Sequence, residues 1–170
     1  MTRCFVAVFP DEAVNRAVDE VVAAAVPPGS PWRPVARERR HVTLRFHGDA
    51  DPGELADALR PRLAGLPAPT LQCSGAGVFG TALWLGVLPD EEVRWSGLLA
   101  AVGADAGEHV AHLTVGRARG RAVAVPPGLE GRHGPSWTPG EAVLVASGSP
   151  YGVLERFPLV GGDEAVGPGR

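Results

Sequence analysis

Short segments rich in apolar, β-branched and aromatic residues recur along the chain, and most are bounded by Gly, Pro or Asp. Such segments, roughly four to eight residues long, are typical of β-strands. The pattern predicts strands over Arg3–Phe9, His41–His47, Thr70–Val78, Ala82–Leu88, Val110–Arg117, Ala142–Ser147 and Val153–Val160. The third and fourth are close enough in sequence to form a hairpin.

Amphipathic helices are expected between several of these strands. The first opens at Pro10-Asp11, where Asp11 is the expected N-cap, and stops at Pro27-Pro28-Gly29. Its inward stripe is expected to consist of Val14, Val18, Val21 and Val22.

Two further helices are predicted from similar signals. Asp51 is the expected N-cap of the second, Pro52 occupies its first position, and Pro61 is expected to kink or end it. The third covers Asp90–Ala106. It is expected to bury Val93, Leu98, Leu99 and Val102.

This order of elements predicts an α+β fold. We expect two duplicated lobes, with antiparallel β-sheets lining a central cleft and helices on the outside. Residues 1–160 are expected to form a single two-lobed domain and 161–170 a disordered tail. The Pro- and Gly-rich stretches Ser30–Arg40 and Pro126–Gly140 are expected to be loops.

Two segments carry the same pattern of chemistry, His41-Val42-Thr43-Leu44 and His112-Leu113-Thr114-Val115, close to half of the 170-residue chain apart. In a strand, residues i and i+2 share a face, so each segment presents a His and a Thr together and buries its apolar residues. Histidine exchanges a proton near neutral pH, and a Thr hydroxyl can donate to an anionic oxygen. Two such pairs facing each other predict an enzyme cleft with an acid, a base and two oxyanion donors.

Composition narrows the class of protein. With 45% hydrophobic and 21% charged residues, the chain is typical of a soluble globular protein. Its net charge of −3 argues against a large non-specific nucleic-acid surface. Cys4 and Cys73 are isolated and expected to be reduced thiols. Because no signal peptide or membrane span is visible, we expect a cytoplasmic protein that does not bind membranes.

Other chemistries fit less well. The stretch Gly75–Gly80 matches the dinucleotide pattern G-x-G-x-x-G, but a strand-like segment follows it where a helix is required. His109 and His112 lack a third ligand nearby, so no metal site is expected. No other cofactor is expected either. The arginines of the first loop, Arg33, Arg37, Arg39 and Arg40, are expected to be solvated, although they precede His41 and could steer a phosphate.

These residues resemble the two-histidine (2H) phosphoesterase superfamily, and within it the LigT-like RNA 2′,3′-cyclic phosphodiesterases, also called 2′-5′ RNA ligases. The family's first motif is similar to His41–Gly48 and its second, His-x-Thr-x-x-Arg, to His112–Arg117. The closing strands resemble Leu144–Ser147 and Tyr151–Leu159. The link between Ser147 and Tyr151 is shorter than is usual in the family.

The resemblance implies a metal-independent hydrolase that acts on RNA ends or cyclic nucleotides. We expect it to be a monomer. It would convert RNA 2′,3′-cyclic phosphate ends to 2′-phosphomonoesters. We expect His41 to be the proton donor and His112 the proton acceptor, while Thr43, Thr114 and Arg117 bind the phosphate. Strict strand alternation would turn Arg117 away from His112, so its role requires either a bulge at Gly116 or the end of the strand there.

Two alternatives remain open. One is a cyclic phosphodiesterase for a small nucleotide such as ADP-ribose cyclic phosphate, with which the short link from Ser147 to Tyr151 is compatible. The other is a non-catalytic module that binds RNA ends.

Overall fold

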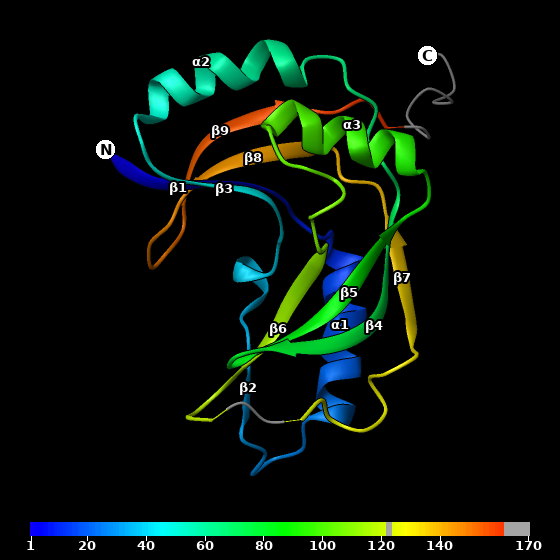
Figure 1. Cartoon of the computed structure of the whole chain (residues 1–170). Helices are drawn as coiled ribbons and strands as arrows, with labels where there is room; N and C mark the ends of the chain where they lie inside the picture. The colour runs from blue at the N-terminus through cyan, green and yellow to red at the C-terminus, as the bar shows by residue number, and fades with distance from the viewer. Residues whose placement is uncertain (122–123, 162–170) are drawn as a thin grey trace.

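The strands form two antiparallel sheets in the computed structural model, which describes residues 1–121 and 124–161 (Figure 1). Sheet 1 has the order β3-β1-β8-β9 and sheet 2 the order β2-β6-β5-β4-β7. Sheet 1 consists of β1 (Thr2–Val8), β3 (Val42–Ala50), β8 (Glu141–Ala146) and β9 (Gly152–Pro158). Sheet 2 consists of β2 (Trp32–Pro34), β4 (Leu71–Phe79), β5 (Ala82–Pro89), β6 (His112–Ala118) and β7 (His133–Trp137).

The helices are α1 (Glu12–Ala25), α2 (Pro52–Leu63) and α3 (Glu92–Val102), and a short 3₁₀ turn covers Arg37–Arg39. The predicted caps are confirmed: Asp11 accepts a hydrogen bond from the Val14 amide and Asp51 accepts one from the Glu54 amide. Within the described residues, no helix is long and apolar enough to cross a membrane.

The two halves of the fold repeat the same unit. In each unit a strand is followed by a helix, and the chain then returns as a second strand that pairs antiparallel with the first. In the first unit β1 leads through α1 to β3, and in the second β5 leads through α3 to β6. Each helix crosses to the other sheet, since α1 contacts β7 and α3 contacts β3. Both His-x-Thr segments therefore lie at the start of the returning strand, as a duplicated two-lobe α+β fold requires (Figure 1).

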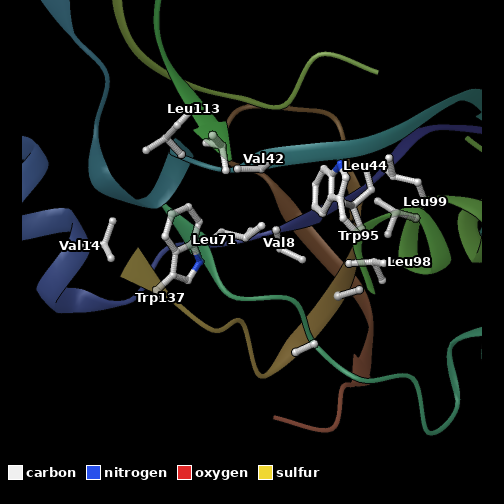
Figure 2. Packing of buried hydrophobic residues seen from close by; sticks show 14 of the residues in the cluster. Val8, Val14, Val42, Leu44, Leu71, Trp95, Leu98, Leu99, Leu113 and Trp137 are labelled. Atoms are coloured by element: carbon white, nitrogen blue, oxygen red, sulfur yellow. The ribbon is translucent and has the colours of Figure 1, made fainter. Parts of the chain in front are cut away.

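The apolar residues of both motifs are part of one core shared by the two sheets. Val42 and Leu113 are fully buried, and Leu44 belongs to the same cluster as Trp95 of α3 (Figure 2). Val8 of β1 belongs to the same cluster. Burial of these residues fixes which side of each motif strand remains outside the core.

The strands missed by the sequence prediction both lie at the edges of sheet 2. The stretch Pro126–Gly140, expected to be a loop, contains β7, and Ser30–Arg40 contains β2. Each edge strand contains a proline, Pro135 or Pro34, which an edge tolerates because one side of the strand needs no ladder hydrogen bonds. Short strands with Pro or Gly leave no alternating pattern in the sequence.

Two helix predictions also need correction. Helix α2 continues through Pro61 to Leu63, because burial of Leu59 and Leu63 holds the last turn in place. Helix α3 ends before Gly103, whose φ of 80° supplies a left-handed cap, and not at Ala106.

The inward side of α3 was also predicted incorrectly at one position. Val93 is 84% exposed, and Trp95 is buried in its place. Residues 162–170 of the predicted tail lie outside the described residues.

Candidate active site

The two motifs meet in a cleft of about 500 Å³ between the sheets. It is lined by Arg33, Pro34, Val35, Ala36, Arg39, His41, Thr43, His112, Thr114, Arg117 and Tyr151. All five residues expected from the sequence to form the site therefore lie in one cavity. The alternation of buried and cleft-facing residues along β3 and β6 places each His beside its own Thr.

The two histidines are held by equivalent hydrogen bonds. His41 Nδ1 donates to the carbonyl oxygen of Arg39 and His112 Nδ1 donates to that of Val110, both at 2.8 Å. A carbonyl oxygen only accepts hydrogen bonds, so in each ring Nδ1 carries the hydrogen. Nε2 is left as the nitrogen that takes or gives a proton, as acid–base catalysis requires.

Aromatic rings surround His41. Phe5 stacks on it with ring centroids 4.8 Å apart, and Tyr151 meets it edge-on at 5.4 Å. Burial lowers the pKa of His41, and the positive charges of His112 and Arg39 lower it further, although the hydrogen bond to the Arg39 carbonyl opposes them. In the free protein His41 therefore loses its proton at a lower pH than an ordinary histidine.

A β-bulge turns Arg117 into the cleft. Trp84 of β5 pairs with Thr114, but the adjacent Leu83 pairs with Gly116, so Val115 is the extra residue in β6. Val115 and Gly116 are consequently both buried, and Arg117 emerges on the side of Thr114. The bulge that the role of Arg117 requires is present.

The arginines before His41 divide into two pairs. Arg40 is buried and bonds Asp19 and the carbonyl oxygens of Val35 and Asn15, so the expectation that the whole run is solvated is wrong for it. Arg37 pairs with Asp19 and Glu12.

The other pair, Arg33 and Arg39, lines the cleft with Arg117. Arg33 pairs with Arg117 across β2 and β6. In the part of the chain that the structure describes, no carboxylate lines this cavity. The cleft is thus strongly positive and suited to a phosphate anion.

Comparison with known proteins identifies the family. A sequence model of the LigT-like phosphoesterases matches residues 8–88. A protein of Thermus thermophilus named RNA 2′,3′-cyclic phosphodiesterase is 35% identical over 193 aligned positions, which cover 99% of this chain and 97% of the relative. The chain belongs to the LigT-like phosphoesterase family.

Solved structures of other proteins agree. TT0787 of Thermus thermophilus superimposes with a TM-score of 0.71 at 30% identity, covering 94% of this chain and 99% of its own. LigT of E. coli, solved with phosphate, gives a TM-score of 0.72 at 26% identity and covers 94% and 98%. These neighbours have the same α+β fold as this LigT-like phosphoesterase.

The structure adds one residue that the sequence did not single out for the site, Tyr151. The Arg39 guanidinium lies over the Tyr151 ring, 4.3 Å from its centroid, and both residues line the cleft. The short link from Ser147 to Tyr151 thus places an aromatic ring against His41. The only signal for Tyr151 in the sequence was its place just before the last strand.

The sequence patterns considered as alternatives have structural explanations. Gly75–Gly80 belongs to β4 and its turn into β5, so no helix follows the glycines. His109 donates from Nε2 to the carbonyl oxygen of Thr43 at 2.8 Å. Across residues 1–121 and 124–161, no three His, Cys, Asp or Glu side chains are grouped as metal ligands would be.

Proposed function

We propose that this protein hydrolyses RNA 2′,3′-cyclic phosphate ends to 2′-phosphomonoesters by two-histidine acid–base catalysis. The observation that carries the proposal is the pair of His-x-Thr segments in one cleft, with both imidazoles held through Nδ1. The Thermus thermophilus relative, whose name states this activity, supports the choice of substrate.

The residues fit an in-line displacement at phosphorus. His112 Nε2 takes a proton from water as the water oxygen attacks phosphorus, and the bond from phosphorus to the 3′-oxygen breaks. His41 gives its proton to that departing oxygen. Thr43 and Thr114 donate to the non-bridging oxygens, where negative charge grows, and Arg117 adds a charge-assisted hydrogen bond.

The donor role of His41 depends on bound substrate. Burial lowers the pKa of His41, which favours the neutral ring in the free protein. A phosphodiester carries a negative charge, and such a charge beside an imidazole favours the protonated form. We therefore propose that substrate binding itself loads His41 with the proton that it donates.

The cleft has more positive charge than one cyclic phosphate needs, and this excess favours RNA ends over single nucleoside 2′,3′-cyclic phosphates. One phosphodiester anion has a single negative charge, which Arg117 alone already balances. Arg33 and Arg39 line the same cavity, and we propose that they bind the phosphate on the 5′ side of the terminal nucleotide. A small nucleotide with a pyrophosphate would satisfy the same two cations.

Turnover of three substrates tests these assignments. We expect an oligonucleotide with a 2′,3′-cyclic end to be hydrolysed with a higher kcat/KM than uridine 2′,3′-cyclic phosphate. A greater kcat/KM for ADP-ribose cyclic phosphate would favour the small-nucleotide activity, and binding of the oligonucleotide without turnover would favour a non-catalytic module. Phosphorus NMR should identify a 2′-phosphate product, whereas a 3′-phosphate would require the His roles to be exchanged.

We further propose that residues 1–160 act as one two-lobed domain, as a monomer, in the cytoplasm. The cleft is lined by residues of a single chain, so one copy supplies both histidines. Cys4 and Cys73 are free, buried thiols, which suits a reducing compartment. Size-exclusion chromatography with light scattering tests the monomer.

A further inference from the structure

His41 is enclosed by three aromatic rings. Phe5 stacks on the imidazole, and Phe9 is tilted against it with ring centroids 5.7 Å apart. Tyr151 closes a third side, edge-on to His41 and also edge-on to Phe5 at 5.3 Å. Phe5 is a buried residue of β1, so its ring is fixed by the sheet. Tyr151, by contrast, belongs to the link between β8 and β9 and lines the cleft.

Arg39 holds the Tyr151 ring in this position. Its guanidinium lies over the face of the ring, and its Nη1 donates to the carbonyl oxygen of Gly148, at 3.4 Å, in the same link. The carbonyl oxygen of Arg39 accepts the hydrogen bond from His41 Nδ1. One residue therefore fixes the imidazole through its main chain, and fixes the ring that covers the imidazole through its side chain.

His112 is less enclosed than His41. The hydrogen bond from His112 to Val110 is exposed, whereas the bond from His41 to Arg39 is partly buried. Phe79, which meets the His112 ring edge-on, is itself 48% exposed. Water, from which the proton acceptor must take a proton, therefore reaches His112 more easily than His41. A proton donor needs the opposite surroundings, because water beside it would compete for its proton.

We propose that Tyr151, held by Arg39, is a positioning residue for His41, which keeps the imidazole oriented and shields it from water. This inference rests on the proposed function, in which His41 gives its proton to the departing oxygen. Because Phe5 belongs to the buried part of sheet 1, Tyr151 is the wall of the enclosure that can be removed from the cleft side.

A substitution of Tyr151 separates enclosure from charge. Apart from Tyr151 itself, four side chains that are charged or can take up a proton line the cleft with His41: Arg33, Arg39, His112 and Arg117. All four remain in place when Tyr151 is replaced. A change in the titration of His41 then reports the loss of its cover.

The test follows the titration of the His41 imidazole by NMR in variants of Tyr151. Burial is the main cause that lowers the pKa of His41, so Tyr151→Ala should raise this pKa towards that of an ordinary histidine. Tyr151→Phe keeps the ring and should titrate as the wild type does.

Hydrolysis of uridine 2′,3′-cyclic phosphate gives a second measurement. Tyr151→Ala should lower kcat by about 10- to 100-fold, the scale expected when a reacting group is slightly misplaced. It should also move the falling limb of kcat/KM to higher pH, which a general loss of stability would not do. Tyr151→Phe should retain both the wild-type kcat and the wild-type pH profile.

Phe46→Ala is the matched control, because Phe46 is also an aromatic ring beneath an arginine. The Arg3 guanidinium lies 5.1 Å from its centroid, and Phe46 belongs to β3. In residues 1–121 and 124–161, the rings that contact His41 do not include Phe46. The titration of His41 and the kinetic constants of Phe46→Ala should equal those of the wild type.

Two results would overturn the role of Tyr151. One is a titration of His41 and a falling limb that are unchanged in Tyr151→Ala. The other is a shift in Arg39→Gln, which removes a charge and releases the ring, without a shift in Tyr151→Ala. If the wild type does not hydrolyse the cyclic phosphate, the proposed function fails, and the NMR titration still decides whether Tyr151 shields His41.

Discussion

His109 Nε2 donates a hydrogen bond to the carbonyl oxygen of Thr43 at 2.8 Å. The bond connects the segment that leads into β6, which carries the second motif, to β3, which carries the first. His109 precedes His112 by one short segment, and its ring packs edge-on against Trp95 of α3 at 5.5 Å. The bond fixes the spacing of two strands that carry opposite sides of the cleft. We therefore expect His109 to be a positioning residue.

Two substitutions of His109 should show whether its hydrogen bond to the Thr43 carbonyl matters for the rate of the reaction. His109→Ala leaves the Thr43 carbonyl without its donor, and we expect a fall in kcat of several-fold or more, in line with the loss of about 1 kcal/mol of hydrogen bonding. His109→Gln can donate from a similar position and should restore most of the activity. Equal losses in both variants would show that the bond does not position the motifs.

Both motif histidines should be required for turnover. His41→Ala and His112→Ala should each lower kcat by about 10²–10⁴, the usual loss when a general acid or base is removed, while circular dichroism shows an unchanged fold. His133→Ala is the control, because His133 bonds Ser74 and does not line the cleft. Near-wild-type turnover in either motif variant would remove that residue from the mechanism.

A substrate with a better leaving group should distinguish the proton donor from the proton acceptor. A p-nitrophenyl phosphodiester of uridine expels a stable phenolate that needs little protonation. His41→Ala should therefore lose much less activity on this ester than on a cyclic phosphate, whereas His112→Ala should lose similar amounts on both. The reverse pattern would make His41 the base.

The rate should depend on pH as a bell, since one histidine must be neutral and the other protonated. Burial lowers the pKa of His41, so in the free enzyme the His41 ring loses the proton that it must donate at a lower pH than an ordinary histidine would. The falling limb of kcat/KM should accordingly lie at lower pH than that of kcat, because the bound phosphate anion favours the protonated ring. A rate that only climbs across the range would contradict paired-histidine catalysis.

How much the sequence could predict depended on whether a feature is local. The position of each His beside its Thr, the Asp11 and Asp51 caps and the hairpin follow from spacing within a few residues, and the structure has each of them. Arg117 was placed only conditionally, because a bulge depends on the register between β5 and β6. Tyr151 was missed because its contact with His41 joins residues far apart in sequence.

Activity should not depend on a divalent metal. In the proposed mechanism, imidazoles transfer both protons, and Thr43, Thr114 and Arg117 bind the phosphate oxygens. Dialysis against EDTA should leave kcat unchanged, with the dialysis buffer alone as control. Loss of activity that one divalent ion specifically restores would show that a metal takes part.

Asp19 ties α1 to the segment before His41 through Arg37 and Arg40. Burial raises the pKa of Asp19, but the hydrogen bonds and charges of the two arginines outweigh it and hold the pKa below the usual value. A carboxyl whose pKa is lower in the folded than in the unfolded state stabilises the fold above its unfolded pKa. That stabilisation disappears as pH falls through the folded-state pKa.

Asp19→Asn should therefore lower the melting temperature at neutral pH, because Arg40, which is 3% exposed, loses its charge partner. The difference from wild type should shrink as the pH falls into the range where Asp19 takes up a proton. Asp57→Asn is the matched control: Asp57 pairs with Arg60, but its side chain is 77% exposed, and such surface pairs contribute little. A melting temperature for Asp19→Asn equal to that of Asp57→Asn at neutral pH would mean that the Asp19 pairs do not hold the segment before His41.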